Sequence, residues 1–402
     1  MKILVINAGS STIKYQLFNM DTKEVIAKGL CERIGQGGLF TFKANGKTVF
    51  NKVSKDMKNH LDAVKIIMES LTNKETGVLS SLEEINAVGH RIVQGAEFFT
   101  SAVLIDAKVL KTIEDLTPLA PLHQPAHASG IKAFLEAMPS KPNVAVFDTV
   151  FHSTIPDYAY RYALPKQAYT EWNIRKYGFH GSSHKFVAEE LEKMTGKKGN
   201  FIICHLGNGC SVSAVSNGKC IDTSMGYTPL EGVMMGTRCG DVDATVVQAI
   251  MEKTGKSVSE VINYLNKQSG LLGVSGVSGD IRDLEEGVGV NSSNQKDVAL
   301  ALKMFAYRIR KYIGSYMAVL GKVDAIAFTA GIGENDSSMR EKILVNLETL
   351  GIEFDANANN SLKKGDAGII STKTSKVKIF VIPTNEELEI ANETLSVVTK
   401  LK

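Results

Sequence analysis

The chain has 402 residues, enough to bury two sizeable cores, so two domains are expected. Its 46 Lys and Arg nearly balance 43 Asp and Glu, and a net charge of +3 is too small to predict a nucleic-acid or anionic membrane partner. The five cysteines form no Cys-x-x-Cys pair or disulfide-like framework, and no apolar run resembles a signal peptide or a membrane span. We therefore expect a cytoplasmic enzyme with small-molecule substrates.

The chain begins with a strand that runs into residues 7–14, Asn-Ala-Gly-Ser-Ser-Thr-Ile-Lys, and continues as a second strand. Gly9 can adopt positive φ and leaves backbone N–H groups open to an anion. The hydroxyls of residues 10–12 add hydrogen-bond donors, and Lys14 supplies positive charge. Residues 7–14 therefore predict a phosphate-handling loop, with an ordinary serine-rich hairpin as the alternative.

A similar arrangement recurs in the middle of the chain, where a strand at 201–205, a glycine-rich turn and a strand at 211–215 follow one another. Both copies continue into a third strand, at 24–30 in the first and, after an Asn-Gly hairpin signal, at 219–223 in the second. The repetition predicts two similar domains that face each other across a nucleotide cleft. A chance similarity between two meanders is the alternative.

The remaining elements alternate between helices and strands. In the first half, helices are expected at residues 60–71, 106–114 and 125–138, strands at 87–93 and 143–148, and a hairpin insertion within 35–51. In the second half, helices are expected at 242–254, 257–267, 297–320, 338–350 and from 386 onward, strands at 325–329 and 377–382, and a surface loop at 355–368. This order predicts an α/β fold with a helix-flanked sheet in each domain, a boundary near residue 151 and a final helix that returns to the first domain.

Several charged or polar side chains lie where predicted strands end. Arg91 suits bidentate binding of a carboxylate or phosphate, although a surface ion pair would also explain it. Asp148 suits a Mg²⁺ ligand or a base. His180 and His184 are four residues apart in a glycine-containing turn, and zinc is the weaker reading because no third ligand is close in the sequence.

Three later segments also contain charged or polar residues that could belong to a functional site. Arg238 stands beside Asp241 and Asp243, which could form a salt-bridged turn before a helix instead of a site. Residues 331–335 and 383–387 each follow a predicted strand, and each could also be an ordinary entry into a helix. Neither a Gly-x-x-x-x-Gly-Lys-Ser/Thr nor a Gly-x-Gly-x-x-Gly motif occurs, so a P-loop or Rossmann enzyme is not expected.

Six of these segments, in order along the chain, resemble the motifs of the acetate kinase family. They are residues 7–14, 178–181 (Gly-Phe-His-Gly), 205–209 (His-Leu-Gly-Asn-Gly), 235–238 (Met-Gly-Thr-Arg), 331–335 (Gly-Ile-Gly-Glu-Asn) and 384–387 (Thr-Asn-Glu-Glu). The resemblance covers essentially the whole chain and includes the wider superfamily of acetate and sugar kinases, heat-shock ATPases and actin.

The resemblance implies an α/β actin-like ATPase fold of two duplicated ribonuclease-H-like domains, with a nucleotide cleft between them. Residues 1–150, joined by the final helix at 386–402, would form the first domain, and residues 151–385 would form the second. The implied reaction is a reversible, direct in-line phosphoryl transfer from ATP to acetate, which gives ADP and acetyl phosphate. It implies Mg²⁺, or Mn²⁺ in its place, and a homodimer.

The resemblance also implies roles for single residues. The catalytic groups would be Arg91, Asp148, His180 and Arg238, with Arg91 also on the acetate carboxylate. The apolar pocket for the methyl group would consist of Val93, Leu122, Phe179 and Pro229. The ATP site would be lined by Lys14, His205, Leu206, Gly207, Asn208, Gly209, Asp280, Ile281, Arg282, Gly331, Ile332, Gly333, Glu334 and Asn335. The metal would be held by Asn7 and Glu386.

Two questions of substrate and mechanism stay open at this point. The family usually has His-Gly-Gly after the position of Val93, and this chain has Gln94 there, so a propionate or butyrate kinase is an alternative. An actin-like or chaperone-like ATPase is a weaker one, because Arg91 and Arg238 together suit an anionic acceptor. A carboxylate with a pKa of about 4.3 is ionised at neutral pH and needs no general base. We therefore expect Asp148 to orient a metal or an arginine, with a covalent route through Glu386 as the alternative mechanism.

Overall fold

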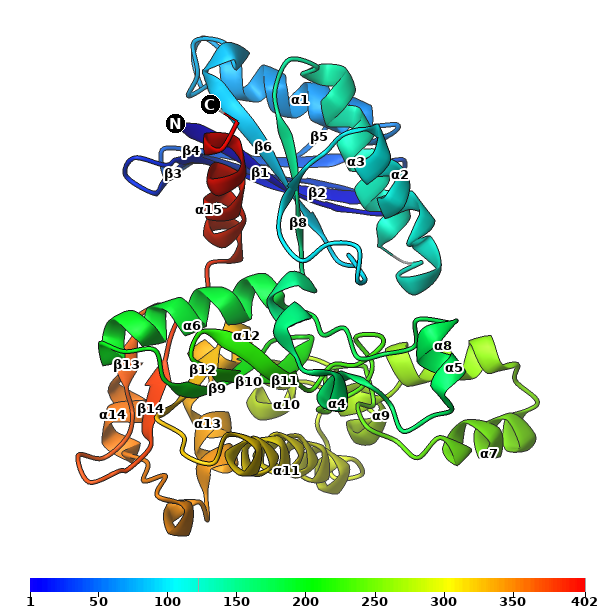
Figure 1. Cartoon of the computed structure of the whole chain (residues 1–402), viewed down its shortest axis with the longest axis vertical. Helices are drawn as coiled ribbons and strands as arrows, with labels where there is room; N and C mark the ends of the chain where they lie inside the picture. Colours follow the sequence, from blue (N-terminus) through cyan, green and yellow to red (C-terminus); the bar gives the residue numbers. More distant parts are fainter. Residues whose placement is uncertain (122, 402) are drawn as a thin grey trace. The chain divides into compact units, whose positions relative to one another are not determined.

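The computed structural model describes residues 1–121 and 123–401. The chain forms two compact units, Met1–Val150 with Asn385–Lys402, and Phe151–Thr384, and each is described by itself (Figure 1). Leu122, expected in the methyl pocket, lies outside the described residues, as does Lys402 at the end of the expected final helix.

Among its described residues, 1–121, 123–150 and 385–401, the first unit contains one sheet, four α-helices and short 3₁₀ turns. Its strands are β1 (Lys2–Gly9), β2 (Thr12–Asn19), β3 (Glu24–Glu32), β4 (Leu39–Ala44), β5 (Lys47–Ser54), β6 (Ile85–Ile92), β7 (Val103–Leu104) and β8 (Asn143–Phe147). Its helices are α1 (His60–Thr72), α2 (Ala107–Asp115), α3 (Gln124–Ala137) and α15 (Glu386–Thr399), with 3₁₀ turns at Leu82–Glu84 and Thr117–Leu119.

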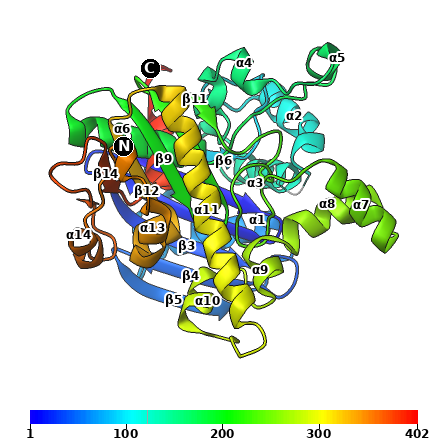
Figure 2. The same cartoon turned by 90° about the horizontal axis from the view of Figure 1, so that it is seen from below.

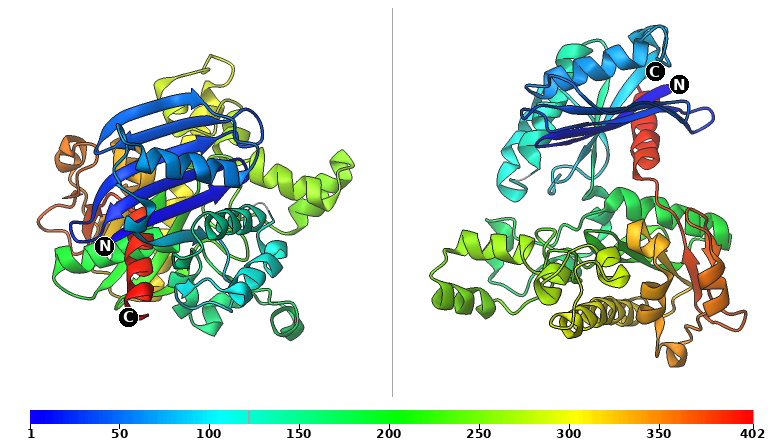
Figure 3. Two further views of the ribbon diagram at one scale, coloured as in Figure 1. Left: turned by 90° about the horizontal axis from the view of Figure 1, so that it is seen from above. Right: turned by 180° about the vertical axis from the view of Figure 1, so that it is seen from behind.

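Helices cover both faces of this sheet, whose strand order is β5-β4-β3-β2-β1-β6-β8-β7. Because side chains alternate along a strand, β1 contributes to two cores. Leu4 and Ile6 pack in the core that includes α1 and α3, whereas Ile3 and Val5 pack with residues of α15. Figure 1 and the right-hand view of Figure 3 show α15 on the face opposite α1. The last helix of the chain therefore completes the core of the first unit.

The second unit contains a six-stranded sheet and eleven α-helices within the part of the chain that the structure describes. Its strands are β9 (Asn200–Leu206), β10 (Cys210–Ser216), β11 (Lys219–Thr223), β12 (Ala325–Thr329), β13 (Gly368–Ile369) and β14 (Lys378–Val381). Its helices are α4 (Asp157–Tyr160), α5 (Lys166–Thr170), α6 (Gly181–Thr195), α7 (Thr245–Thr254), α8 (Val258–Lys267), α9 (Gly270–Ser275), α10 (Ile281–Glu286), α11 (Gln295–Leu320), α12 (Ala330–Asn335), α13 (Ser337–Leu344) and α14 (Ala356–Ser361), with 3₁₀ turns at Val150–Thr154 and Glu348–Leu350.

The sheet of the second unit also lies between helices. Val187 and Leu191 of α6 pack against Phe201 and Ile203 of β9 on one face. The long helix α11 contacts β9 and β10 from the other face, which Figure 2 shows as the helix that crosses the sheet. The strand order is β11-β10-β9-β12-β14-β13.

Five strands have the same order and direction in both sheets. In the first unit, β3-β2-β1 are antiparallel neighbours, and β6 and β8 continue the sheet in parallel. In the second unit, β11-β10-β9 are antiparallel neighbours, and β12 and β14 continue in parallel. An antiparallel edge strand, β7 or β13, ends each sheet. The predicted duplication of an α/β fold is confirmed, and β4 and β5 form the predicted hairpin insertion.

The structure defines the backbone at two of the motifs. Gly9 does not use the positive φ that glycine allows. A side chain there would place its Cβ 2.6 Å from Thr12 Oγ1, so any larger residue would force the Thr12 side chain to move. The segment expected as a glycine-containing turn around His180 and His184 instead begins α6, with His180 as its N-cap residue at a left-handed φ of 59°.

Two further expectations in the second unit are wrong in their extent. The helix expected at 338–350 ends at Leu344, and Asn346 adopts a left-handed φ of 62°, a conformation that asparagine tolerates. The surface loop expected at 355–368 contains α14, whose first turn is capped when the Asp355 side chain accepts from Ala358 N–H. Asparagine-rich residues 356–361 carry no hydrophobic periodicity that would have indicated a helix.

Candidate functional site

In the first unit, Arg91 and Asp148 form a bidentate ion pair at the carboxyl ends of two neighbouring strands. Arg91 belongs to β6 and Asp148 directly follows β8, which is parallel to β6. Arg91 Nε donates to Asp148 Oδ1 at 3.0 Å, and Nη2 donates to Oδ2 at 2.6 Å. The side chain of Asp148 is 3% exposed and that of Arg91 is 20% exposed. A buried carboxylate therefore orients a guanidinium that is accessible from solvent.

The two charges of this pair affect each other in opposite ways. Burial raises the pKa of Asp148, and the positive charge of Arg91 opposes that rise. Burial alone would lower the pKa of Arg91, but the carboxylates of Asp148 and Glu386 reverse this and raise it. Arg91 is consequently a permanent cation, and both oxygens of Asp148 are engaged in orienting it.

The residues expected at the metal and the phosphates lie around this pair in the same unit. Asn7 is near the end of β1, opposite Lys14 of β2 in the antiparallel register. Lys14 forms an ion pair with Glu387 in the first turn of α15. Glu386 precedes it and lies close enough to Arg91 and Asp148 to influence the pKa of each. The first unit thus brings two cations and three carboxylates together near the ends of its inner strands. They are Lys14, Arg91, Asp148, Glu386 and Glu387.

Val93 and Gln94 continue from Arg91 into a buried segment. Val93 is 5% exposed, and its N–H donates to His127 Nε2 at 3.3 Å. Gln94 is fully buried, its Oε1 accepts from Ala96 N–H at 2.9 Å, and its backbone oxygen accepts from Gln124 Nε2 at 3.0 Å. The amide that replaces the usual histidine is therefore held by its own loop.

In the second unit, His180, Ser211 and His184 form a chain of side-chain hydrogen bonds. His180 Nδ1 lies 2.9 Å from Ser211 Oγ, and His184 Nε2 lies 2.7 Å from the same oxygen. Ser211 belongs to β10, while His184 is in the first turn of α6. The two histidines considered as zinc ligands thus share one hydroxyl group, and the described residues contain no group of three potential metal-binding side chains.

His205 lies against this chain and connects to a second one. Its ring stacks on that of His180 with centroids 4.1 Å apart, and its Nδ1 lies 2.7 Å from Ser183 Oγ. Ser183 Oγ is 2.9 Å from Thr384 Oγ1. The turn that follows β9, residues 207–209, is half-exposed to exposed, as a nucleotide-contacting loop requires.

Glu334, expected to contact ATP, also makes structural contacts within the second unit. Its Oε1 accepts from Ala330 N–H at 2.7 Å and from Thr384 N–H at 3.0 Å, so it joins the ends of β12 and β14. Gly331 and Asn335, at the two ends of the expected nucleotide segment, are exposed, and the segment is the short helix α12 and not a loop. Asp280 and Arg282 pair with each other through two hydrogen bonds, of 3.0 and 2.6 Å, at the start of α10.

Arg238 and Pro229 lie on one loop of the second unit. Arg238 Nη1 donates to the Pro229 carbonyl oxygen at 3.2 Å, and the Met235 N–H donates to the Arg238 carbonyl oxygen at 3.1 Å. Burial lowers the pKa of Arg238. The loop therefore holds the guanidinium through the Pro229 carbonyl oxygen and through Met235 Sδ, which lies 3.7 Å from Arg238 Nη1, and within the described residues no carboxylate forms an ion pair with it.

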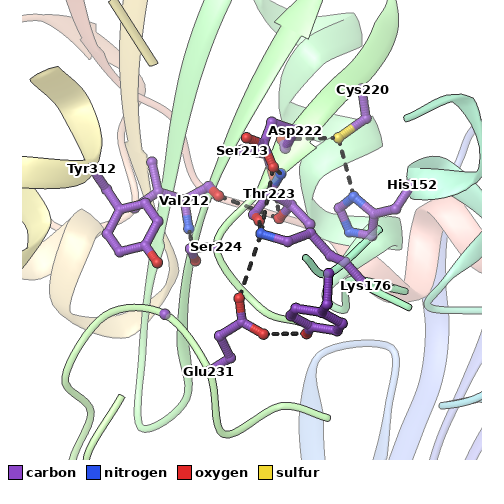
Figure 4. A network of polar contacts seen from close by, with 12 residues as sticks. His152, Lys176, Val212, Ser213, Cys220, Asp222, Thr223, Ser224, Glu231 and Tyr312 are labelled. Atoms are coloured by element: carbon purple, nitrogen blue, oxygen red, sulfur yellow. Dashed lines mark hydrogen bonds and ion pairs between the residues drawn. The ribbon is translucent and has the colours of Figure 1, made fainter. Parts of the chain in front are cut away.

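A polar network anchors this loop to the sheet (Figure 4). Lys176 Nζ donates to the Thr223 carbonyl oxygen at 2.7 Å and lies 3.5 Å from Asp222 Oδ1 and 3.7 Å from Glu231 Oε1. Glu231 also accepts from the hydroxyl of Tyr162. Glu231 is two residues from Pro229, and the Pro229 carbonyl oxygen accepts from Arg238. The network therefore holds the part of the loop that contacts Arg238.

His152 links this network to Phe179, another residue expected in the methyl pocket. His152 Nδ1 lies 3.2 Å from Cys220 Sγ, and Nε2 lies 2.8 Å from the Phe179 carbonyl oxygen. Burial lowers the pKa of His152 to about 4, so the ring is neutral. Phe179 itself is 2% exposed.

The expected site residues thus form two groups, one in each unit. Arg91, Asp148 and Glu386 are close together in the first unit, and His180, His205 and Arg238 belong to the second. Sequence reasoning missed Ser211, Ser183 and Lys176 because nothing in their neighbourhood distinguishes them from ordinary polar residues. The alternation of serines in 211–213, next to a strand that contains a histidine, was the only available signal.

The chain matches known proteins over its full length. Residues 2–392 match the model of the acetokinase family. The chain is 53% identical to the acetate kinase of Thermoanaerobacterium thermosaccharolyticum and 53% identical to that of Thermoanaerobacter pseudethanolicus, with 100% of both chains covered in each case.

Solved structures of two carboxylate kinases are also similar to this chain in sequence and fold. The Porphyromonas gingivalis acetate kinase has a TM-score of 0.93 and 42% identity, with 99% of each chain covered. A propionate kinase from Francisella tularensis has a TM-score of 0.90 and 42% identity, with coverage of 98% of this chain and 99% of the other. The chain therefore belongs to the acetokinase family, whose members are kinases that act on a carboxylate.

Proposed function

We propose that this chain is a Mg²⁺-dependent acetate kinase that transfers the γ-phosphoryl group of ATP directly to acetate, reversibly. The observation that carries the proposal is the full-length match, at 53% identity, to proteins named acetate kinase. The arrangement of charged groups supports it, because Arg91 and Arg238 are cations suited to an anionic acceptor and an anionic phosphoryl group.

Charge stabilisation is the main task in this reaction. Phosphoryl transfer spreads negative charge over oxygens in a loose transition state, so fixed cations and hydrogen-bond donors lower its energy. Arg91 would bind the acetate carboxylate, and Arg238 and His180 would act on the transferred group.

Asp148 would orient Arg91 and would not act as a base. Both of its oxygens accept hydrogen bonds from Arg91, which supports this role. The acceptor carboxylate has no proton to remove at neutral pH, because its pKa is about 4. The ionised acceptor can also attack the phosphoryl group directly, so the reaction needs no covalent intermediate on Glu386, which favours a single displacement.

Mg²⁺ fits the residues that the resemblance assigned to it. Mg²⁺ usually takes one or two protein carboxylates together with phosphate oxygens and waters. Asn7 offers an amide oxygen and Glu386 a carboxylate, and among described side chains the latter forms no hydrogen bond or ion pair within 4 Å. These two residues would hold Mg²⁺, or Mn²⁺ in its place, which neutralises charge on the phosphates of ATP.

A propionate kinase is the second candidate, since a solved propionate kinase is as similar in sequence, at 42% identity, as a solved acetate kinase. One methylene group is worth only about 1 to 3 kcal/mol in a hydrophobic pocket, so both acids would react. We expect a higher kcat/KM for acetate. The comparison of kcat/KM for acetate, propionate and butyrate tests this preference.

We also propose a cytoplasmic homodimer. All five cysteines are free thiols, which supports a reducing compartment. Among the described helices, none combines the length and apolarity that a membrane crossing needs. Sedimentation of the purified chain tests the dimer.

The decisive test of function is the hydroxamate assay, which traps acyl phosphate formed from ATP and acetate. We expect acetyl phosphate to form only with ATP, acetate and a divalent cation together. ATP consumption that is independent of any short carboxylic acid, without acyl phosphate, would overturn the proposal and favour an actin-like or chaperone-like ATPase.

A further inference from the structure

The hydrogen-bonded chain of His180, Ser211 and His184 restricts which ring nitrogens can carry a proton. Ser211 Oγ is 2.9 Å from His180 Nδ1 and 2.7 Å from His184 Nε2. A hydroxyl group has one proton, so it can donate to only one of these two nitrogens. The other nitrogen must then donate to the hydroxyl oxygen.

The surroundings of His184 decide between the two directions. His184 is fully buried, and its Nδ1 has no hydrogen-bond partner among the described residues. If Ser211 donated to His184 Nε2, the neutral ring would carry its proton on Nδ1, as a buried N–H without an acceptor. Orphaned buried N–H groups are rarer than unsatisfied acceptors. The favoured arrangement therefore has a proton on His184 Nε2, which donates to Ser211.

The remaining arrangements are less favourable for related reasons. A protonated His184 would carry both N–H groups, but burial lowers the pKa of His184, and the neighbouring His152 and His205 lower it further. If both histidines donated to Ser211, its hydroxyl proton would lack an acceptor, because within residues 1–121 and 123–401 Ser211 Oγ contacts only these two rings. Only one arrangement leaves every buried donor satisfied.

We propose that His184 and Ser211 are positioning residues that keep His180 in the tautomer with its proton on Nε2. His184 Nε2–H donates to Ser211, and the Ser211 hydroxyl donates to His180 Nδ1. The hydrogen bond at one ring nitrogen sets the tautomer of the other. His180 then presents an N–H donor, and not a lone pair, at the ring nitrogen away from Ser211.

This tautomer matters for phosphoryl transfer, and here the inference rests on the proposed function. Phosphoryl oxygens accept hydrogen bonds and repel lone pairs, so a neutral His180 helps only as the Nε2–H form. The backbone of His180 is fixed as well, at the left-handed φ of 59° of the residue that precedes α6. Such strained conformations persist where the surrounding structure fixes them.

The tautomer can be read directly in the full-length protein without any substrate. In a ¹⁵N-histidine-labelled sample, the shifts of the two ring nitrogens distinguish a protonated from an unprotonated position, and the His180→Gln variant assigns the signals. We expect His180 to be protonated on Nε2 and unprotonated on Nδ1. A wild-type His180 with its proton on Nδ1 would overturn the proposal.

Ser211→Ala tests the connection between the tautomer and the reaction. We expect loss of the fixed tautomer and a kcat about 10²-fold lower, as for removal of one preorganised donor, with the KM for ATP nearly unchanged. Ser213→Ala is the matched control, because Ser213 is also fully buried on β10 and its Oγ contacts Thr223 Oγ1 at 2.8 Å instead of a histidine. Equal effects of the two variants on kcat and on the spectrum would contradict the proposal.

His184 offers a second pair of variants if Ser211→Ala folds poorly. His184→Gln keeps an N–H that can donate to Ser211, so the His180 tautomer and most of the kcat should be retained. His184→Leu removes the donor, and Ser211 can then accept from His180 Nδ1–H, which reverses the tautomer. Failure of wild-type protein to make acetyl phosphate, with His180 protonated on Nε2, would refute the proposed function but support the hydrogen-bond arrangement.

Discussion

The two sheets have five strands in common order, and in each a carboxylate joins the ends of the two parallel strands. In the first unit, Asp148 after β8 binds the Arg91 side chain at the end of β6. In the second unit, Glu334 accepts from the backbone N–H groups of Ala330 after β12 and Thr384 after β14. The first arrangement leaves an oriented cation at the strand ends, whereas the second leaves only main-chain contacts.

The duplicated architecture therefore places a carboxylate at equivalent strand ends in both units, but the groups that this carboxylate binds differ. In the second unit, the expected cation is Arg238, whose guanidinium donates to the Pro229 carbonyl oxygen without a carboxylate partner among the described residues, and His180 is joined by a hydrogen bond to Ser211. Removing a cation should therefore have different consequences in the two units.

The largest effect is expected from loss of the two arginines. Arg91→Ala and Arg238→Ala should each lower kcat by about 10³-fold, since each removes a charge that stabilises the transition state. Arg91→Ala should also destabilise the fold by about 3 kcal/mol, because it leaves Asp148 buried without its partner. Arg238→Ala should change the free energy of unfolding little. Acyl phosphate formation and urea unfolding measure the two effects.

The exposed Arg161, whose guanidinium lies over the Tyr169 ring, provides the control for this pair of variants. Arg161→Ala should leave kcat unchanged. An Arg238→Ala enzyme within about tenfold of wild type would contradict the role given to the second unit.

Acid should destabilise both units through buried neutral histidines. Burial lowers the pKa of His90 to about 4 and of His127 to about 3 in the first unit, and of His152 to about 4 in the second. Unfolded histidine has a pKa of about 6.5, so the unfolded state binds more protons as the pH falls below this value. Stability is full above pH 6.5 and should decline toward pH 4, by about 1.4 kcal/mol per pH unit for each such histidine.

Urea unfolding at a series of pH values measures this decline. His90→Gln should reduce the slope, because the glutamine amide can still donate to Asn143 Oδ1, which lies 2.8 Å from His90 Nε2, but does not titrate. An unchanged slope in His90→Gln would show that the buried ring is not responsible.

A smaller loss of stability is expected when a cation is removed from the ion pairs of the second unit. Lys176→Met leaves Asp222 and Glu231 without their shared cation, and the three side chains are only 13%, 22% and 32% exposed. We expect a loss of about 2 kcal/mol, less than for a fully buried pair because water screens these charges. Lys111→Met, which removes an exposed pair with Asp115, should cost at most about 0.5 kcal/mol. Equal losses would show that the network in Figure 4 does not stabilise the loop.

Much of the fold could be predicted because hydrophobic alternation and turn chemistry are local signals. The strand at 325–329 was placed at its observed bounds, and the Asn217-Gly218 turn joins β10 and β11 as the hairpin signal indicated. The start of α6 was missed because Gly181 and the serines after it resemble a turn, and only packing against the sheet makes that segment a helix.

The site was less predictable than the fold for a similar reason. Arg91 and Asp148 could be proposed from their positions after predicted strands, because parallel strands bring their carboxyl ends together. Their ion pair forms because β6 and β8 are neighbours in the sheet. No local sequence pattern predicts which strands are neighbours. Ser211 depends even more on tertiary structure, because its two partners belong to α6 and the residue before it.

We propose that the phosphoryl group passes from ATP to acetate in a single displacement, without a covalent enzyme intermediate. The most direct test follows the configuration of a chiral, isotopically labelled γ-phosphoryl group from ATP to acetyl phosphate. We expect inversion of configuration. Retention would contradict it, because two successive displacements, such as a route through Glu386, would then be required.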